Sequence, residues 1–328
     1  MEHPEIKYGK TGVLLINLGT PDSTSWWDIR KYLKEFLSDK RVIEVNPILW
    51  QIILNVFILT FRPSKTARAY KKIWMKEKNT SPLRHYTISQ TEKVNKEIGN
   101  ENLIIDFAMR YGNPSIKNKI VDLQGKGCEK IIILPLYPQY AAPTTATVCD
   151  EVYRTLMKLR WQPNLQIIPH YESEPLYIDA IVNSLNKKMS QIDWKPEVIV
   201  ASYHGVPKKY FEKGDPYHCY CHKTSRLISE KFDKVPIITT FQSRFGPEQW
   251  LQPYTDKTLE SLPKEGKKNI LIICPGFASD CVETLEEISI EGKESFIEAG
   301  GKNFSMVPCL NDSSDHIELL KYLIKKSL

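Results

Sequence analysis

The sequence predicts an α/β protein made of two doubly wound, Rossmann-like lobes, each with a four-stranded parallel sheet flanked by helices. Two observations lead to this fold class. Eight short apolar runs rich in β-branched residues recur along the 328 residues, and amphipathic stretches long enough for helices separate them. Strands that alternate with helices are typical of parallel sheets covered on both faces. The chain is also long enough to bury two modest cores.

The eight runs are continuous rather than alternating in polarity, as expected for strands buried on both faces. The first half of the chain holds four of them, at residues 12–19, 103–111, 130–139 and 165–171. The second half holds the other four, at residues 198–205, 236–244, 269–277 and 304–311. The clearest intervening helices are expected over residues 25–37 and 280–299.

This rhythm predicts one lobe over residues 1–172 and another over residues 173–328, joined near residues 172–176. We expect the last helix, residues 316–328, to be able to cross back onto the first lobe. The symmetry is inferred from the order of the runs, because the two halves are not visibly similar in sequence. A cleft between lobes is then the default place for a ligand.

Charge and cysteine content narrow the class of protein. The net charge of +6 comes from basic residues spread along the chain, which suits an anionic ligand or an acidic membrane surface and does not indicate nucleic acid. The seven cysteines are odd in number and scattered, as for free thiols in a reducing compartment. The polar first twelve residues show no signal-peptide pattern, so we expect a cytoplasmic protein.

One segment invites a membrane interpretation. Residues 48–61, ILWQIILNVFILTF, form an apolar run of only 14 residues that includes Gln51 and Asn55. A spanning helix needs about 20 apolar residues, so a spanning role is disfavoured. Two interpretations stay open, namely a buried or half-buried helix and an exposed apolar lip that touches a membrane or a greasy ligand.

Polar side chains gather where the predicted strands of the second half end. The fifth run ends on His204, and the seventh leads into Asp280, Glu283 and Glu287, which would share one face of an α-helix. A capped helix with acidic residues in its first turn explains Asp280 and Glu283 equally well. If both strands belong to one sheet, however, a histidine and carboxylates meet at its edge. Such a group can bind a divalent cation or move protons.

The first half repeats this arrangement with different chemistry. Arg110 and Tyr111 end the second run, Tyr137 follows the third, and a helix beginning near Thr144 could hold an anion. Neither GxGxxG nor GxxxxGK[ST] occurs, so nucleotide binding is disfavoured.

The stretch HCYCH, residues 218–222, resembles a set of metal ligands. Its spacing is too tight for the usual zinc loop, and no second cysteine pair follows at finger spacing. We therefore expect a solvent-facing loop with reactive thiols rather than a structural metal.

Five long motifs that span nearly the whole chain are similar to those of ferrochelatases of the bacterial type. They are GVLLINLGTPDS, LYPQYAAPTTAT, SYHGVPKKYFEKGDPYHCYCHKTSRL, TTFQSRFGPEQWLQPYTDKTLE and CPGFASDCVETLEEI. The resemblance implies a lyase that inserts Fe²⁺ into protoporphyrin IX, gives protohaem and releases two protons, as the final step of haem biosynthesis. It also implies that the porphyrin lies in a cleft between two lobes.

The resemblance assigns roles to individual residues. The catalytic and metal-handling pair falls on His204 and Glu283, and Asp280 and Glu287 complete an acidic stripe beside it. Porphyrin-binding residues fall on Arg110, Tyr111 and Tyr137. The expected partners are protoporphyrin IX and Fe²⁺, with no nucleic acid and with peripheral contact at the inner face of the membrane.

Three departures from the family pattern are visible. The stretch KNTSPL, residues 78–83, replaces a glycine-rich loop, and Cys281 stands where some members have a histidine. The chain ends at Leu328 without a cysteine-rich tail, and Ala142 occupies the internal cysteine position. We therefore expect no [2Fe–2S] cluster and no permanently bound cofactor, with Fe²⁺ as a substrate.

Alternative functions remain open at this level. The chain could be a related chelatase for another tetrapyrrole such as coproporphyrin, or for another metal such as cobalt. It could also be a non-catalytic tetrapyrrole carrier.

Overall fold

The computed structural model describes residues 7–328, and the chain divides into two compact units. The first unit holds the residues up to Leu136, together with Ala142–Pro169 and Ile317–Leu328. The second unit holds Tyr137–Ala141 and His170–His316. The C-terminal segment therefore belongs to the first unit, although the chain reaches it only after completing the second.

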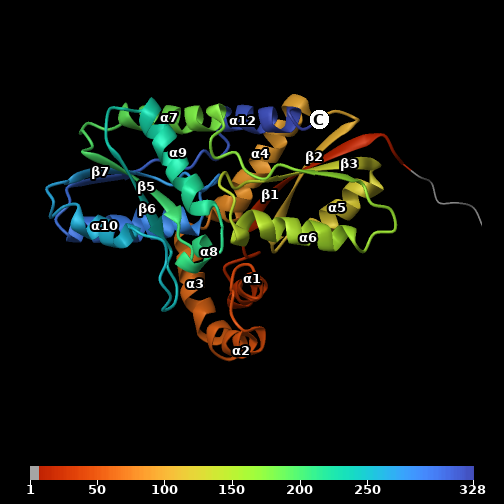
Figure 1. Cartoon of the computed structure of the whole chain (residues 1–328), viewed down its shortest axis with the longest axis horizontal. Coiled ribbons are helices and arrows are strands. Elements are labelled where there is room, and N and C mark those ends of the chain that lie inside the picture. Colours follow the sequence, from red (N-terminus) through yellow and green to blue (C-terminus); the bar gives the residue numbers. More distant parts are fainter. Residues whose placement is uncertain (1–6) are drawn as a thin grey trace, which may run out of the picture. The chain divides into compact units, whose positions relative to one another are not determined.

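Each unit contains a four-stranded parallel sheet (Figure 1), and all eight predicted runs form strands. The first sheet has the order β2-β1-β3-β4 and the second the order β6-β5-β7-β8, so both follow the same topology. The strands of the first sheet are β1 (Lys10–Gly19), β2 (Leu103–Tyr111), β3 (Cys128–Pro135) and β4 (Asn164–Ile167). Those of the second are β5 (Val198–His204), β6 (Ile237–Gln242), β7 (Asn269–Ile273) and β8 (Asn303–Met306).

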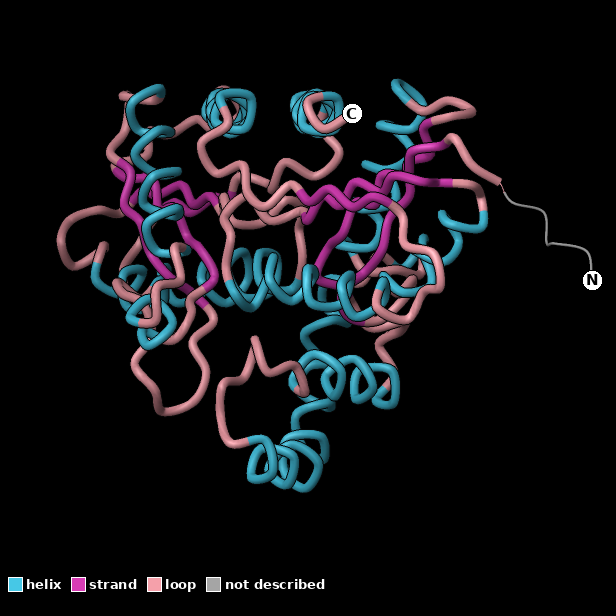
Figure 2. Tube along the Cα trace, turned by 45° about the vertical axis from the view of Figure 1, so that its right-hand side comes forward, coloured by secondary structure: helices cyan, strands magenta, loops and turns pink. Residues whose placement is uncertain are grey.

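Helices cover both faces of each sheet (Figure 2), which confirms the predicted α/β fold class. The α-helices of the first unit are α1 (Trp26–Leu37), α2 (Pro47–Ile53), α3 (Leu59–Ile73), α4 (Pro82–Ile98), α5 (Ile116–Gly125), α6 (Thr147–Leu156) and most of α12 (Ser314–Lys325). Those of the second are α7 (Pro175–Met189), α8 (Lys208–Glu212), α9 (Tyr217–Lys231), α10 (Thr255–Ser261) and α11 (Lys293–Glu298). Short 3₁₀ or π segments are η1 (Leu54–Ile58), η2 (Lys76–Lys78), η3 (Ala142–Ala146) and η4 (Glu283–Gly292).

Local sequence explains where these elements begin and which face they bury. Ser25 caps α1 by accepting a hydrogen bond from the Asp28 N–H, and the residues that α1 buries recur every three or four positions. The central strands β1 and β5 carry apolar residues on both faces. Val13–Ile16 and Ile199–Ala201 are fully buried, as parallel strands between two layers of helices require.

The order of the strands fixes where a ligand can bind. In each sheet the first and third strands lie side by side, and their connections leave toward opposite edges. Ligands of open α/β sheets bind at this switch point, outside the carboxyl ends of the strands. In the second unit it lies at the ends of β5 and β7.

The segment that follows α1 is exposed rather than buried. Elements α2, η1 and α3 join into one helix, Pro47–Ile73, and α2 lies away from the sheet of its unit (Figure 1). By length and composition alone this helix of 27 residues could cross a membrane, with 17% of its apolar window buried. The exposed apolar side chains, here called the lip, are Ile48, Leu49, Ile52, Val56, Phe57 and Phe61.

Two local expectations are wrong. Residues 218–222 lie in the first turns of α9 rather than in a loop, so the two thiols face different surroundings: Cys219 is exposed and Cys221 is buried. The single regular helix expected over residues 280–299 is instead the π-helix η4 followed by α11. A π-helix closes i to i+5 hydrogen bonds, so the periodicity of an α-helix does not apply to it.

Candidate active site

His204 is the last residue of β5 and its ring is half-buried. Its Nδ1 lies 2.6 Å from the carbonyl oxygen of Gly205. Because a carbonyl only accepts, Nδ1 carries the hydrogen of this bond, and in the neutral ring the lone pair is on Nε2. The ring of Trp250 lies near it, with 6.5 Å between ring centres. His204 is thus held in an orientation with one nitrogen ready to accept a proton or a metal ion.

Gly205 allows β5 to leave the sheet at this point. Its N–H donates to the carbonyl of Gln242 at 2.7 Å. A Cβ atom at residue 205 would come within 2.7 Å of that same oxygen and 3.1 Å of the Trp250 ring. The strand can therefore pair with the end of β6 and turn only where no side chain is present.

Glu287 is held by the end of the neighbouring strand β6. The Ser243 N–H donates to Glu287 Oε1 at 2.7 Å, and the Ser243 hydroxyl donates to Oε2. The Gln242 amide donates to the same Oε2 at 3.2 Å and to the backbone carbonyl of Glu283 at 2.8 Å. Ser243 has a φ of 64°, a left-handed conformation that is uncommon for residues other than glycine and is often found at functional sites.

The electrostatics of Glu287 link it to the other predicted residues. Burial raises the pKa of the Glu287 carboxyl above its ordinary value, and the negative charge of Glu283 acts in the same direction. The Ser243 hydrogen bond and the positive form of His204 oppose this increase in pKa. The structure therefore brings His204, Glu283 and Glu287 into one electrostatic neighbourhood.

Asp280 is held by a separate set of hydrogen bonds. Its carboxylate is buried and accepts hydrogen bonds from the Thr284 hydroxyl at 3.0 Å, the Cys309 N–H at 3.3 Å and the Asn311 amide at 2.7 Å. These bonds tie the start of η4 to the loop after β8. The helical-face argument that joined Asp280 to Glu283 and Glu287 fails, because η4 begins at Glu283 and is a π-helix.

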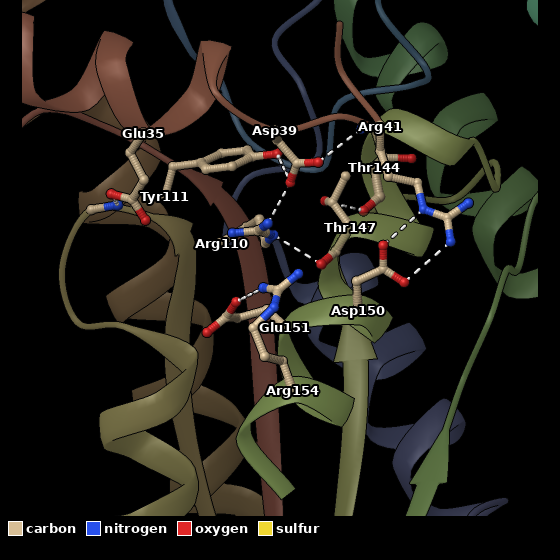
Figure 3. Close-up of polar contacts among 11 residues, drawn as sticks. Glu35, Asp39, Arg41, Arg110, Tyr111, Thr144, Thr147, Asp150, Glu151 and Arg154 are labelled. Atoms are coloured by element: carbon tan, nitrogen blue, oxygen red, sulfur yellow. Dashed lines mark hydrogen bonds and ion pairs between the residues drawn. The ribbon is translucent and has the colours of Figure 1, made fainter. Parts of the chain in front are cut away.

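Arg110 and Tyr111, at the end of β2 in the first unit, both contact Asp39 (Figure 3). The Arg110 guanidinium donates to Asp39 Oδ2 and, at 2.8 Å, to the carbonyl of Thr147. The Tyr111 hydroxyl donates to Asp39 Oδ2 at 3.0 Å, and the backbone N–H of Arg41 donates to Oδ1 at 2.8 Å. Arg110 therefore already has a counter-ion.

Tyr137 belongs to a different unit from Arg110 and Tyr111. It is buried and belongs to the segment Tyr137–Ala141, which clusters with the second unit, whereas Arg110 and Tyr111 belong to the first. Within residues 7–328, no three His, Cys, Asp or Glu side chains form a group that could hold a metal ion.

Three residues of these networks were not predicted as site residues. Gln242 and Ser243 carried a usable signal, because they are polar and directly follow a buried strand. Asp39 carried none, because a charged residue just after a helix is common on any protein surface. Its contact with Arg110 joins residues 71 positions apart and depends on the tertiary fold.

Comparison with known proteins identifies the family. The family model described as ferrochelatase matches residues 10–328. The chain is 54% identical over 330 residues to the ferrochelatase of Allorhizobium ampelinum, covering 100% of this chain and 96% of that protein. It is 50% identical over 332 residues to the ferrochelatase of Francisella tularensis subsp. novicida, covering 100% of this chain and 99% of that protein.

Solved structures with the same fold are more distant. SirB from Bacillus subtilis with Fe³⁺ has a TM-score of 0.59 and 12% identity, covering 97% of this chain and 95% of that chain. CbiX, titled the terminal enzyme for biosynthesis of sirohaem in denitrifying bacteria, has a TM-score of 0.52 and 11% identity. The match covers 97% of this chain and 99% of that chain. These two likenesses concern the fold alone. The match over nearly all of the sequence, together with relatives at half identity or more, shows that this chain belongs to the ferrochelatase family.

Proposed function

We propose that this chain inserts Fe²⁺ into protoporphyrin IX, gives protohaem and releases two protons. Its family is that of lyases in haem biosynthesis, so iron insertion into a porphyrin is its reaction. The observation that carries the residue assignment is the fixed tautomer of His204. With Nδ1 committed to Gly205, Nε2 keeps its free lone pair. The charges of His204 and Glu283 both act on the Glu287 carboxyl, which supports a joint role for the three groups.

The reaction requires the enzyme to handle protons as well as iron. Two of the four central nitrogens of a free porphyrin carry protons, and both must leave as Fe²⁺ enters. Distortion of the macrocycle exposes the nitrogen lone pairs, so binding the bent form better than the flat one lowers the barrier. We assign proton and metal handling to His204 and Glu283, since imidazole and carboxylate do both at neutral pH.

Glu287 fits a supporting role in proton release. Burial raises the pKa of its carboxyl, so this group takes up a proton more readily than an exposed glutamate. The donors from Ser243 and Gln242 stabilise the ionised form after the proton leaves. A carboxyl balanced between the two states is suited to relaying protons from His204.

Asp280 has a structural role in this proposal. Its three hydrogen bonds fix the first turn of η4, and that turn carries Glu283. We assign it to positioning Glu283 rather than to contact with iron.

We assign Arg110, Tyr111 and Tyr137 to porphyrin binding, with Arg110 as the partner of a substrate carboxylate. Because Asp39 neutralises Arg110 in the free protein, an incoming propionate would have to share or replace that carboxylate. Asp39 is then the internal counter-ion that keeps the buried guanidinium paired until substrate arrives.

The exposed lip supports peripheral contact with a membrane. Its six large apolar side chains are all more than half exposed, and basic residues Arg62, Lys65 and Arg68 follow in the same helix. An apolar face beside basic residues suits insertion at an anionic lipid surface. Such contact would place a cytoplasmic enzyme at the inner face of the membrane, where an apolar porphyrin is also soluble.

Insertion of Fe²⁺ by the purified protein, without nucleotide and without oxygen, tests the proposal. We expect protohaem to form from protoporphyrin IX faster than the corresponding product forms from coproporphyrin. His204→Ala should abolish insertion while the quenching of porphyrin fluorescence still reports binding. Normal turnover in this variant would remove His204 from the mechanism. Tight porphyrin binding without insertion by the wild-type protein would favour a carrier instead.

A further inference from the structure

Two histidines outside the active site lie side by side on α9. His218 and His222 are four residues apart, so they project from the same side of the helix, one turn apart. Their ring centres are 4.4 Å apart and the ring planes are inclined by 49°. Among residues 7–328, neither ring has a hydrogen bond or an ion pair, so their nitrogens are uncommitted.

Aromatic neighbours hold these rings in place. The His218 ring stacks on Phe241, with 5.8 Å between centres and 18° between planes, and meets the edge of Phe211 at 5.2 Å. The His222 ring lies 6.1 Å from Phe241. Each imidazole is therefore partly preorganised, which lowers the entropy that a ligand must remove on binding.

Both rings are in the protonation state that a metal ion requires. Burial lowers the pKa of His218 and His222, and the neighbouring ring lowers that of His222 further. At neutral pH each ring is therefore neutral and carries a free lone pair. Because metal ions bind the neutral imidazole, no proton has to be displaced.

The spacing also fits joint coordination. A metal–nitrogen bond of about 2.0–2.1 Å places the metal roughly 3.2 Å from the centre of an imidazole ring. Two rings whose centres are 4.4 Å apart then subtend an angle of about 90° at a shared metal ion. That angle is the one between neighbouring ligands in octahedral and square-planar complexes.

We propose that His218 and His222 form a peripheral binding site for a first-row divalent cation that prefers imidazole, with Ni²⁺ as the test ion and water completing the coordination. The same nitrogen ligands suit Cu²⁺ and Zn²⁺, and they bind all three ions more tightly than Fe²⁺. The site would therefore collect ions that compete with the iron substrate.

This site is distinct from the active site. Phe241 and Gln242 are consecutive residues of β6, so their side chains point to opposite faces of the sheet. The histidine pair packs on the Phe241 side, and Glu287 is bound on the Gln242 side. His222 also borders an open surface hollow of about 390 Å³ with Ser225, Ser229 and Thr239, which gives water and ions access. Arg226, in the same hollow, is paired with Glu230 at 2.5 Å.

Titration of the full-length protein with Ni²⁺ alone, followed by calorimetry, tests the proposal. The parent protein carries His204→Ala, so that the active-site imidazole does not contribute to the signal. We expect one equivalent of Ni²⁺ to bind. His222→Ala and His218→Phe each remove one proposed ligand, and the phenylalanine keeps the stack on Phe241. Each variant should weaken Ni²⁺ binding at least about tenfold, because even the loss of a residue that only orients a metal ligand costs about tenfold in affinity.

Two matched controls separate this site from other metal-binding groups. Cys219→Ser changes the exposed thiol on the same turn of α9, and His85→Ala removes a histidine in the first unit. Both should bind Ni²⁺ as the parent does. Circular dichroism without metal verifies that each variant is folded. Undiminished binding in both histidine variants, binding lost only in Cys219→Ser, or no binding by the parent would each overturn the proposal.

Discussion

The pair formed by Asp39 and Arg110 gives the sharpest quantitative prediction. The side chains of Asp39 and Arg110 are only 11% and 8% exposed, so removing the charge of Asp39 leaves a guanidinium buried without a counter-ion. Breaking a buried ion pair from one side costs about 3–5 kcal/mol of unfolding free energy. For Asp39→Asn we expect the lower end, about 3 kcal/mol, because the amide oxygen can still accept the Arg41 N–H.

Calorimetry measures this loss directly. At roughly 2–4 °C per kcal/mol for a unit of this size, Asp39→Asn should lower the Tm by about 6–12 °C. The matched control is Asp150→Asn, in the same network (Figure 3). In the wild-type protein Asp150 pairs with Arg41 at 2.8 Å, but the Asp150 side chain is 34% exposed and that of Arg41 is 45% exposed. This surface pair should contribute no more than about 1 kcal/mol.

Porphyrin then tests the proposed exchange of carboxylates. A ligand at 100 times its Kd stabilises a protein by about 2.7 kcal/mol. If a porphyrin carboxylate pairs with Arg110, it should stabilise Asp39→Asn more than the wild-type protein, because the variant lacks the competing carboxylate. A Tm loss as small as that of the control would refute the buried-pair reasoning. An equal porphyrin-induced shift in both proteins would refute the exchange.

Three other predictions concern Glu287, His316 and the lip. If Glu287 must be ionised for turnover, Ser243→Ala removes a hydrogen bond that lowers its pKa, so the acidic limb of the pH–rate profile should move to higher pH. Ser243→Gly also removes the hydroxyl but tolerates the positive φ, so it should move the acidic limb to higher pH as well. A shift in Ser243→Ala but not in Ser243→Gly would attribute the effect to backbone strain rather than to the lost hydrogen bond. Burial lowers the pKa of His316 from 6.5 to about 4, so the unfolded chain takes up the proton first and stability falls as pH drops from 6.5 to 4. The loss is about 3 kcal/mol. Chemical denaturation of His316→Gln should therefore show a flatter pH dependence over that window than the wild-type protein, and an equally steep dependence would contradict the prediction. Phe57→Glu should reduce co-sedimentation with anionic vesicles without changing insertion of iron into detergent-solubilised porphyrin, and unchanged sedimentation would argue against lip contact.

The sequence by itself determined the elements of this protein and the segments that carry its chemistry. Apolar runs of strand length and capped amphipathic helices are local signals, so all eight strands and helix α1 could be predicted. The long motifs likewise pointed to His204, which ends β5, and to Glu283, which follows β7 after a loop. Both lie toward the carboxyl ends of strands, where open α/β sheets bind ligands.

Only the tertiary structure decided which polar groups pair and which apolar groups stay exposed. Ser243 reaches Glu287 across 44 residues, and Asp39 reaches Arg110 across 71, distances at which no local pattern carries information. Asp280 is bound by the loop after β8, through Cys309 and Asn311, which lie about 30 residues further along the chain. The lip has the composition of a buried helix and is nevertheless exposed, because burial depends on what packs against a segment rather than on its own hydropathy.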